Sequence, residues 1–311
     1  MNNIKFSKCP LCFYSCSFRL KYDFGEHKIY ECKKCKFKYL SPQPNIDELK
    51  KLYNSDSYFK NINFYKGHNL SIFGYADYFA EKFNKQHQFR KIALKLKKLL
   101  IKSNKFKFNK TKLLEIGCGP GFFLKEAAFA GFKCQGVEFN KNIISKLNKY
   151  QKIPIKYANY ENIIDHEKEK FHAIVILDVI EHFQNPFKVF ENIYNSLLPG
   201  GILVISTIDS DSFMSKIIGK RLEDFRRFRE HLFFFDRNNL QNLLNRLGFK
   251  IIYINFWGHT FRFDHLASRI GLISPLLKIP FILLFKIFKS LPSKSIYINP
   301  GTKIIIYAIK K

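Results

Sequence analysis

The sequence has 311 residues, 46% of them hydrophobic, which is enough for one large domain and a small appendage around a buried core. Its net charge of +28 comes from lysines spread along the chain, so we interpret most of them as solvated surface charges; nucleic acid or anionic lipid as a partner stays open. Lys5 and Lys8 are followed by cysteines and not by an apolar stretch, so we expect no signal peptide and a cytoplasmic protein. Seven cysteines then favour a metal site or free thiols over disulfides.

Two C-x-x-C pairs lie within the first 40 residues, separated by residues 13–31. This spacing is typical of a four-cysteine zinc site in which each pair supplies two thiolates. Four thiolates leave no open position for water, so we expect a structural zinc that stabilises a small ribbon-like module at residues 1–42. The predicted ligands are Cys9, Cys12, Cys32 and Cys35.

Residues 43–110 are predicted to form a linker, a lid and the N-terminal helices. A short helix is expected at 47–53, and the aromatic stretch 58–75 is interpreted as a linker or a lid over a ligand pocket. Residues 86–102 place apolar side chains on one face and lysines on the other, which predicts an amphipathic helix that packs on a sheet.

A glycine-rich turn at 117–121 follows an apolar strand and precedes a helix. In open α/β sheets ligands bind at such a strand–turn–helix junction. Glycine is needed there because a Cβ would hold the ligand away from the backbone, and because the turn can require positive φ. The spacing is G-x-G-x-G, one residue shorter than the G-x-G-x-x-G of dinucleotide folds.

From residue 111 to residue 311, apolar strands alternate with helices. This alternation predicts an α/β domain with a mostly parallel seven-stranded sheet and helices on both faces. The predicted strands are 112–116, 133–138, 154–157, 172–177, 202–207, 250–255 and 303–309, and the helices lie near 122–131, 140–150, 186–197 and 237–247.

The segment E-I-G-C-G-P-G at 115–121 resembles motif I of class I S-adenosylmethionine-dependent methyltransferases. Three more motifs of this family follow in order: Glu138 at the end of the second strand, the segment 171–182, which ends in D-V-I-E-H, and the P-G-G segment within 197–207. The resemblance covers residues 110–256 and implies a Rossmann-like methyltransferase fold with S-adenosylmethionine as cofactor.

The resemblance also implies a set of cofactor-binding residues. Glu138 is expected to accept hydrogen bonds from both ribose hydroxyls, as an acidic residue does in nucleotide folds. Glu115 is implied near the methionine amine and Asn159 near adenine, although a polar turn residue would also explain Asn159. The complete predicted set is Glu115, Gly117, Gly119, Gly121, Glu138, Asn159 and Asp178.

Two histidine-containing pairs are candidates for the general base of a methyl transfer. The first, Glu181-His182, follows the fourth strand. Some related O-methyltransferases hold a divalent cation with a carboxylate-x-x-Glu-His set, which Asp178, Glu181 and His182 match in type and spacing. A role in capping the next helix is the alternative.

The second pair is Glu230-His231. Residues 229–235 resemble the His-Glu-His-x-x-Tyr-Phe segment of zinc-containing sugar C-methyltransferases, where this segment supplies the catalytic base. Arg229 and Phe234 replace the first histidine and the tyrosine, and the sequence has no counterpart of that family's extra C-terminal domain. The alternative is a histidine at a helix entry that packs on neighbouring phenylalanines.

The segment 270–289 is the most apolar part of an insertion at about 262–295. Its charge-free runs are too short to cross a bilayer. On a helix, Lys278, Lys286 and Lys289 fall on one side, so we expect either a pocket cap packed on the core or a helix at a membrane surface.

The leading hypothesis is methyl transfer to a small hydroxylated acceptor, such as a nucleotide-linked or lipid-linked sugar of a surface polysaccharide pathway. His231, assisted by Glu230, or His182 would be the base. An RNA methyltransferase is the alternative that the positive charge and the zinc knuckles favour. A non-catalytic scaffold that keeps the cofactor fold is the third hypothesis. No oligomeric state is predicted.

Overall fold

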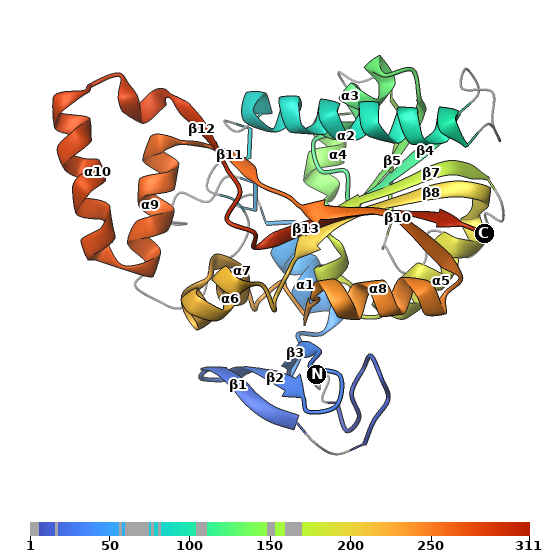
Figure 1. Cartoon of the computed structure of the whole chain (residues 1–311), viewed down its shortest axis with the longest axis horizontal. Helices are drawn as coiled ribbons and strands as arrows, with labels where there is room; N and C mark the ends of the chain where they lie inside the picture. Colours follow the sequence, from blue (N-terminus) through green and yellow to red (C-terminus); the bar gives the residue numbers. More distant parts are fainter. Residues whose placement is uncertain are drawn as a thin grey trace.

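A computed structural model of the chain describes residues 6–15, 18–55, 58–59, 75, 78–79, 82–103, 111–147, 153–158 and 170–311. Its centre is a seven-stranded sheet in the order β10-β13-β8-β7-β4-β5-β6 (Figure 1). The strands are β4 (Lys112–Ile116), β5 (Lys133–Glu138), β6 (Ile155–Tyr157), β7 (Phe171–Leu177), β8 (Leu197–Ile208), β10 (Phe249–Phe256) and β13 (Lys303–Lys310).

Five of these strands run parallel, from β8 through β7, β4 and β5 to β6. β13 pairs antiparallel with both β8 and β10. The mostly parallel seven-stranded α/β sheet predicted from the sequence is therefore confirmed. β8 begins at Leu197, earlier than the predicted 202, because Leu197 pairs with Phe171 before the register shifts.

Helices cover both faces of the sheet, as Figure 1 shows. One face carries α2 (Lys82–Lys102), α3 (Phe122–Phe129) and α4 (Lys141–Leu147), and the other carries α1 (Ile46–Tyr53), α5 (Pro186–Ser196) and α8 (Arg237–Arg246). Two separate apolar cores result. Ile92, Leu96 and Leu100 of α2 belong to the first, and Phe190 of α5 and Leu240 of α8 belong to the second.

The cysteine-containing segment forms a second sheet of four strands. β1 (Phe18–Phe24), β2 (His27–Cys32) and β3 (Lys38–Ser41) form an antiparallel meander. The fourth strand, β9 (Phe233–Phe234), comes from the C-terminal half of the chain and pairs with β3. This sheet therefore joins the cysteine segment directly to the segment that holds Glu230 and His231.

A helical hairpin projects beside the sheet, at the left of Figure 1. It consists of α9 (Phe263–Ile273) and α10 (Pro275–Ile287) and is flanked by β11 (His259–Arg262) and β12 (Ser295–Ile298), which pair with each other. We call residues 263–294 the apolar hairpin. Among the described residues, each helix is too short or too polar to cross a bilayer.

The lysines of this hairpin are not arranged as the sequence predicts. Lys278 is half-buried and points at α9, since a Cβ on Gly271 would lie 3.0 Å from its Cδ. Lys286 is exposed on α10, and Lys289 is exposed beyond the end of that helix. Helix pairing turns Lys278 inward, whereas periodicity alone placed it with the other two.

Candidate functional site

The glycine-rich turn joins β4 to α3 and has a conformation that favours glycine. Gly117, Gly119 and Gly121 have φ of 71°, 49° and 71°, in the left-handed region. A Cβ on Gly117 would lie 2.5 Å from Cγ2 of Val179. The turn therefore has no side-chain atoms at its three glycines and packs close to the neighbouring strand end, while the N–H groups of Gly117 and Gly121 donate to the carbonyls of Val137 and Cys118.

Glu138 ends β5 and lies beside this turn. Its Oε2 accepts the N–H of Gly119 at 2.7 Å, and its Oε1 accepts the N–H groups of Phe139 at 2.7 Å and Asn140 at 2.8 Å. These bonds fix the orientation of a buried carboxylate that lines a pocket together with Gly117 and Gly119. A carboxylate has about four lone-pair sites and these backbone donors occupy three, so bonds from both ribose hydroxyls would have to share acceptor sites with them.

Glu115 lies in the wall of the adjoining pocket, which also contains Gly117 and Asp178. Its side chain is buried, and Oε2 has no hydrogen-bond partner among the described residues. Burial, and then the nearby Glu138 carboxylate, raise the pKa of Glu115 well above its ordinary value. A buried carboxyl oxygen without a donor fits an ammonium group such as that of the cofactor's methionine part.

Asp178 lies at the carboxyl end of β7 and lines both of these pockets. Its φ of 56° is unusual for a non-glycine residue. Oδ1 accepts the hydroxyl of Ser206 at 3.1 Å, and Oδ2 accepts Nζ of Lys303 at 2.9 Å. Burial raises the pKa of Asp178, but Lys303 and then His259 outweigh burial and hold that pKa below its ordinary value. Asp178 is therefore an ionised partner of Lys303.

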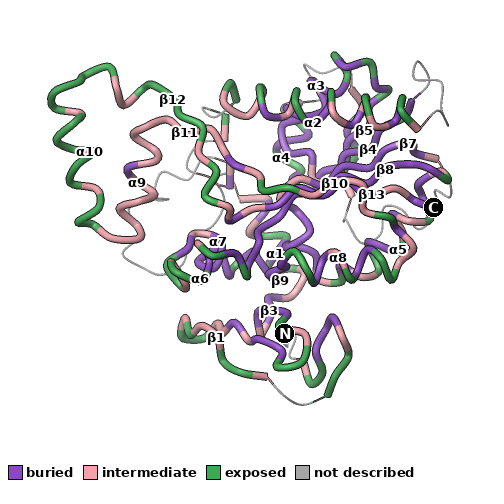
Figure 2. Tube along the Cα trace, viewed as in Figure 1, coloured by how far each residue is buried: buried purple, intermediate pink, exposed green. Residues whose placement is uncertain are grey.

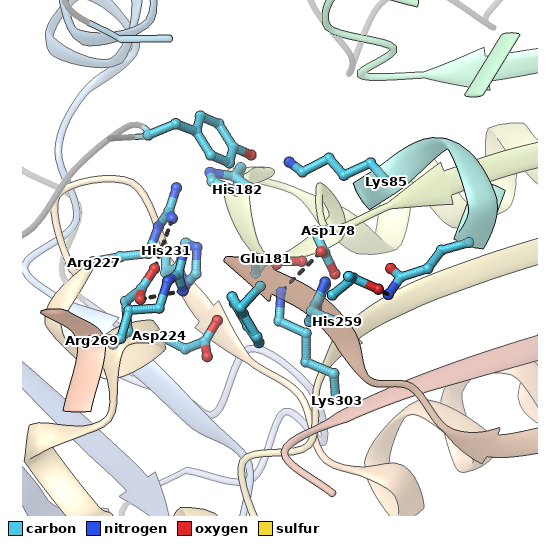
Figure 3. A pocket seen from close by; sticks show the side chains of 15 residues that line it. Lys85, Asp178, Glu181, His182, Asp224, Arg227, His231, His259, Arg269 and Lys303 are labelled. Carbon is cyan, nitrogen blue, oxygen red and sulfur yellow. Dashed lines mark hydrogen bonds and ion pairs between the residues drawn. The ribbon is translucent and has the colours of Figure 1, made fainter. Parts of the chain in front are cut away.

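The two candidate histidines lie together in one pocket, shown in Figure 3. His182 ends the short 3-10 turn Ile180–His182, and His231 precedes β9. Their ring centroids are 4.8 Å apart and the rings are nearly perpendicular. The hydroxyl of Tyr53 lies 2.8 Å from Nδ1 of His182, whereas Nδ1 of His231 has no partner among the described residues. The sequence treated these histidines as competitors, and the structure brings them together.

Burial keeps both rings neutral. Together with the Arg227 guanidinium it lowers the pKa of His182 to about 3. Burial, followed by the charges of His182 and Arg227, lowers the pKa of His231 well below its ordinary value. A neutral imidazole can accept a proton, which is what a general base requires.

Glu181 and Glu230 differ in their relation to this pocket. Glu181 lines the pocket, and the hydroxyl of Thr207 donates to its Oε2 at 2.9 Å. Burial, and then Asp178, raise the pKa of Glu181 to about 8. Glu230 is buried behind the pocket wall, where its Oε1 is 2.8 Å from Nη2 of Arg227.

Ligand atoms of Glu181, His182 and His231 all lie within 4.8 Å of one another. These three side chains could hold a divalent cation. The cation set expected from the sequence contained Asp178 in place of His231. In the structure, the Asp178 carboxylate is paired with the Lys303 ammonium instead.

The four cysteines form two similar knuckles. Phe13 N–H donates to Cys9 O and Lys36 N–H donates to Cys32 O, each at 2.9 Å, and both donors have positive φ. The four sulfurs lie within 4.8 Å of one another; Cys9 and Cys35 are 3.6 Å apart and Cys12 and Cys32 are 3.8 Å apart. A tetrahedron with zinc–sulfur bonds of about 2.3 Å has edges of about 3.8 Å, so the cluster fits zinc.

Sequence analysis missed several residues that line these pockets. Lys303 was predicted only as part of a strand, Tyr53 only as a helix end, and nothing was predicted for His259, yet Lys303 and His259 line the histidine pocket and Tyr53 contacts His182. A charged residue at the start of an apolar strand was the only signal for Lys303. Asn159, the predicted adenine contact, lies outside the described residues.

Comparison with known proteins identifies the family. The sequence profile of a methyltransferase domain matches residues 83–254, which is more than half of the chain. The chain belongs to this family of methyltransferases, which use S-adenosylmethionine, and its seven-stranded sheet is the Rossmann-like fold of that class.

Individual relatives cover less of the chain. An uncharacterized protein of Methanocaldococcus jannaschii is 29% identical over 177 residues, which is 57% of this chain and 81% of that protein. The ubiquinone biosynthesis O-methyltransferase of Rickettsia prowazekii is 32% identical over 112 residues, which is 35% of this chain and 44% of that enzyme. The chain thus spans less than half the length of the Rickettsia enzyme.

Among solved structures, a SAM-dependent methyltransferase from Archaeoglobus fulgidus is similar to the chain. It has a TM-score of 0.46 and 19% identity, and the match covers 75% of this chain and 100% of that one. With a TM-score below 0.5, this likeness adds nothing to the assignment, which rests on the family match and the order of the strands.

Replacing Glu138 tests the cofactor site. In Glu138→Ala, affinity for S-adenosylmethionine should fall by about tenfold to a hundredfold, because hydrogen bonds to a buried charged group are lost. Glu191→Ala, which removes an exposed carboxylate from α5, is the matched control and should bind normally. Calorimetry measures both, with circular dichroism to verify folding. Unchanged affinity in Glu138→Ala would remove Glu138 from the site.

The neutral state of His182 should make stability depend on pH. Because its pKa is depressed in the folded chain, the unfolded chain binds the extra proton, and stability that is complete above pH 6.5 is lost as pH falls toward 3. At pH 5 the loss should be on the order of 2 kcal/mol.

Urea unfolding at pH 7.5 and pH 5 measures this effect. In His182→Gln the free energy of unfolding should lose the pH dependence that His182 contributes. In His87→Gln, which replaces an exposed histidine, the pH dependence should be the same as in the wild type. Identical pH dependence in wild type and His182→Gln would show that His182 is not held neutral.

Proposed function

We propose that the chain transfers a methyl group to a small hydroxylated acceptor, such as a nucleotide-linked or lipid-linked sugar, in the cytoplasm. The observation that carries this proposal is a pair of buried, neutral histidines that line one pocket. Asp178 lines this pocket and also the two pockets that contain Gly117. An acceptor next to His182 and His231 would therefore be adjacent to the cofactor. The O-methyltransferase of Rickettsia prowazekii supports a hydroxyl over other acceptor atoms.

S-adenosylmethionine supplies a methyl group already activated for displacement. We propose that Glu115 and Glu138 hold its amino-acid and ribose parts, with the backbone of Gly117, Gly119 and Gly121 between them. The remaining task of the chain is to align the acceptor and remove its proton. The walls that the pockets share can align the acceptor with the cofactor. Removal of the acceptor's proton then requires a base.

We propose His231 as the general base, because its Nδ1 has no partner among the described residues and its ring is neutral. His182 is the second candidate. Its Nδ1 lies 2.8 Å from the Tyr53 hydroxyl and its ring also bonds to the backbone of Glu230, so both contacts fix the ring. Glu230 would hold Arg227 in place and would not contact the acceptor, since it lies behind the wall of the histidine pocket and is ion-paired with Arg227.

The lining of the histidine pocket is polar and carries charges of both signs. The cations Lys85, Arg227, Arg269 and Lys303 lie in its wall with the carboxyl groups of Asp178, Glu181, Glu223 and Asp224 and the polar groups of Gln88 and Thr260. Amide, hydroxyl and carboxyl groups all bind sugar hydroxyls. This lining supports a hydroxylated acceptor over a neutral aromatic one.

Two metal roles complete the proposal. A zinc bound by Cys9, Cys12, Cys32 and Cys35 would be structural, because no ligand position remains for water. A divalent cation at Glu181, His182 and His231 is the alternative to base catalysis by histidine. Such a cation would lower the pKa of the acceptor hydroxyl, and chelation would then abolish transfer.

Single-turnover methyl transfer separates these roles. The acceptor is first identified by incubating the protein with labelled cofactor and cell extract and analysing the labelled product by mass spectrometry. His231→Ala should then slow transfer by about a hundredfold or more, whereas affinity for the cofactor should stay within about twofold. His182→Ala should have a smaller effect if it only orients the acceptor.

His87→Ala, on the exposed face of α2, is the matched control and should transfer at the wild-type rate. Wild-type activity in both His182→Ala and His231→Ala would eliminate histidine as the base. Loss of activity on chelation, with zinc still bound to the cysteines, would support the cation instead.

A further inference from the structure

The outer helix of the apolar hairpin, α10, buries none of its residues. Figure 2 shows it mostly in the colour of exposed residues, with α9 between it and the rest of the molecule. Most of its apolar side chains are exposed to solvent, by fractions between 43% for Ile282 and 74% for Leu276. The exposed apolar residues of the helix and its end are Leu276, Leu277, Ile279, Ile282, Leu283, Leu284, Ile287 and Phe288. A contiguous exposed apolar surface made by eight side chains marks an interaction site.

The charge of the hairpin beyond Asp264 has one sign. From residue 265 to residue 311 the sequence contains no aspartate or glutamate. Within the hairpin, the basic residues are Arg269, Lys278, Lys286, Lys289 and Lys294. Lys286 and Lys289 are exposed and adjoin Ile287 and Phe288. A partner must therefore offer both an apolar interior and negative charge at its surface.

We propose that the apolar hairpin lies in the interface of an anionic lipid bilayer. A basic helix with a wide apolar face inserts its apolar side chains just below the headgroups, and its lysines extend toward the phosphates. α10 has 13 residues, which span about 20 Å and are too short for a hydrocarbon core of about 30 Å. The helix therefore lies along the surface.

The hairpin is tied to the histidine pocket. Nη1 of Arg269 in α9 is 2.5 Å from Oε2 of Glu223, and Nη1 of Arg226 donates to the carbonyl of Leu272 at 3.3 Å. Both partners belong to α7 (Glu223–Arg226), and Arg269 and Glu223 line the pocket. A bilayer at α10 would thus be one helix, α9, away from the pocket wall. If the proposed function holds, this placement selects the lipid-linked acceptor over the soluble nucleotide-linked one.

Vesicle sedimentation with the full chain tests membrane docking without acceptor or cofactor. The wild type should bind vesicles of phosphatidylglycerol and phosphatidylcholine, and retain part of this binding in 0.5 M salt because apolar contacts are not screened. The double variant Leu283→Asp, Ile287→Asp should bind on the order of a hundredfold more weakly, since two inserted side chains are lost.

The matched control is the double variant Phe83→Asp, Phe129→Asp. These phenylalanines are 79% and 81% exposed on α2 and α3, so the variant has the same charge change outside the hairpin. Its vesicle binding should stay within about twofold of wild type. Calorimetry with S-adenosylmethionine verifies that both variants are folded.

Three results would overturn the proposal. Wild-type protein that stays in the supernatant with anionic vesicles has no membrane partner. Equal weakening in both double variants would mean that net charge alone causes binding. A self-associated chain that Leu283→Asp, Ile287→Asp converts to monomer, without vesicle binding, would assign this face to a second copy. None of these results depends on whether methyl transfer occurs.

Discussion

The backbone of Leu232 joins three parts of the molecule that are distant in sequence. Its N–H donates to the carbonyl of Glu181 at 2.8 Å, and its carbonyl accepts the N–H of Leu40 at 2.9 Å and the side-chain amide of Gln43 at 3.1 Å. The residue before it is His231. The position of His231 against His182 therefore depends on a strand of the cysteine sheet as well as on the turn after β7. Buried backbone groups must be paired, so this arrangement is strongly determined.

Two cationic side chains around the two buried, neutral histidines are paired with carboxylates. Lys303 is bound to Asp178, and Arg227 is bound to Glu230. Each of these two cations is thus held by a carboxylate in or behind the wall around the imidazoles. Lys303 arrives on β13, whose antiparallel direction brings its first residue to the edge where the parallel strands end. The single reversed strand supplies a cation at the site.

The sequence was sufficient for most of the fold because the relevant signals are local. Apolar runs that end in glycine, as at 113–117, define a strand and its turn, and the helix at 86–102 follows from its periodicity. Pairing between distant segments has no such signal. Nothing near Phe233 indicates that it pairs with Tyr39. Tertiary packing brings His182 against His231 and turns Lys278 inward. The sequence therefore identified these residues but could not predict their positions relative to their neighbours in the fold.

The most direct test of the link through Leu232 is hydrogen–deuterium exchange of the segment 228–236 in wild type and in Cys9→Ser. If the cysteine cluster holds β3 against β9, loss of one thiolate should release zinc and speed exchange at Leu232, while calorimetry shows S-adenosylmethionine affinity within about twofold of wild type. Unchanged protection of this segment in a protein whose cysteine sheet has unfolded would contradict the account.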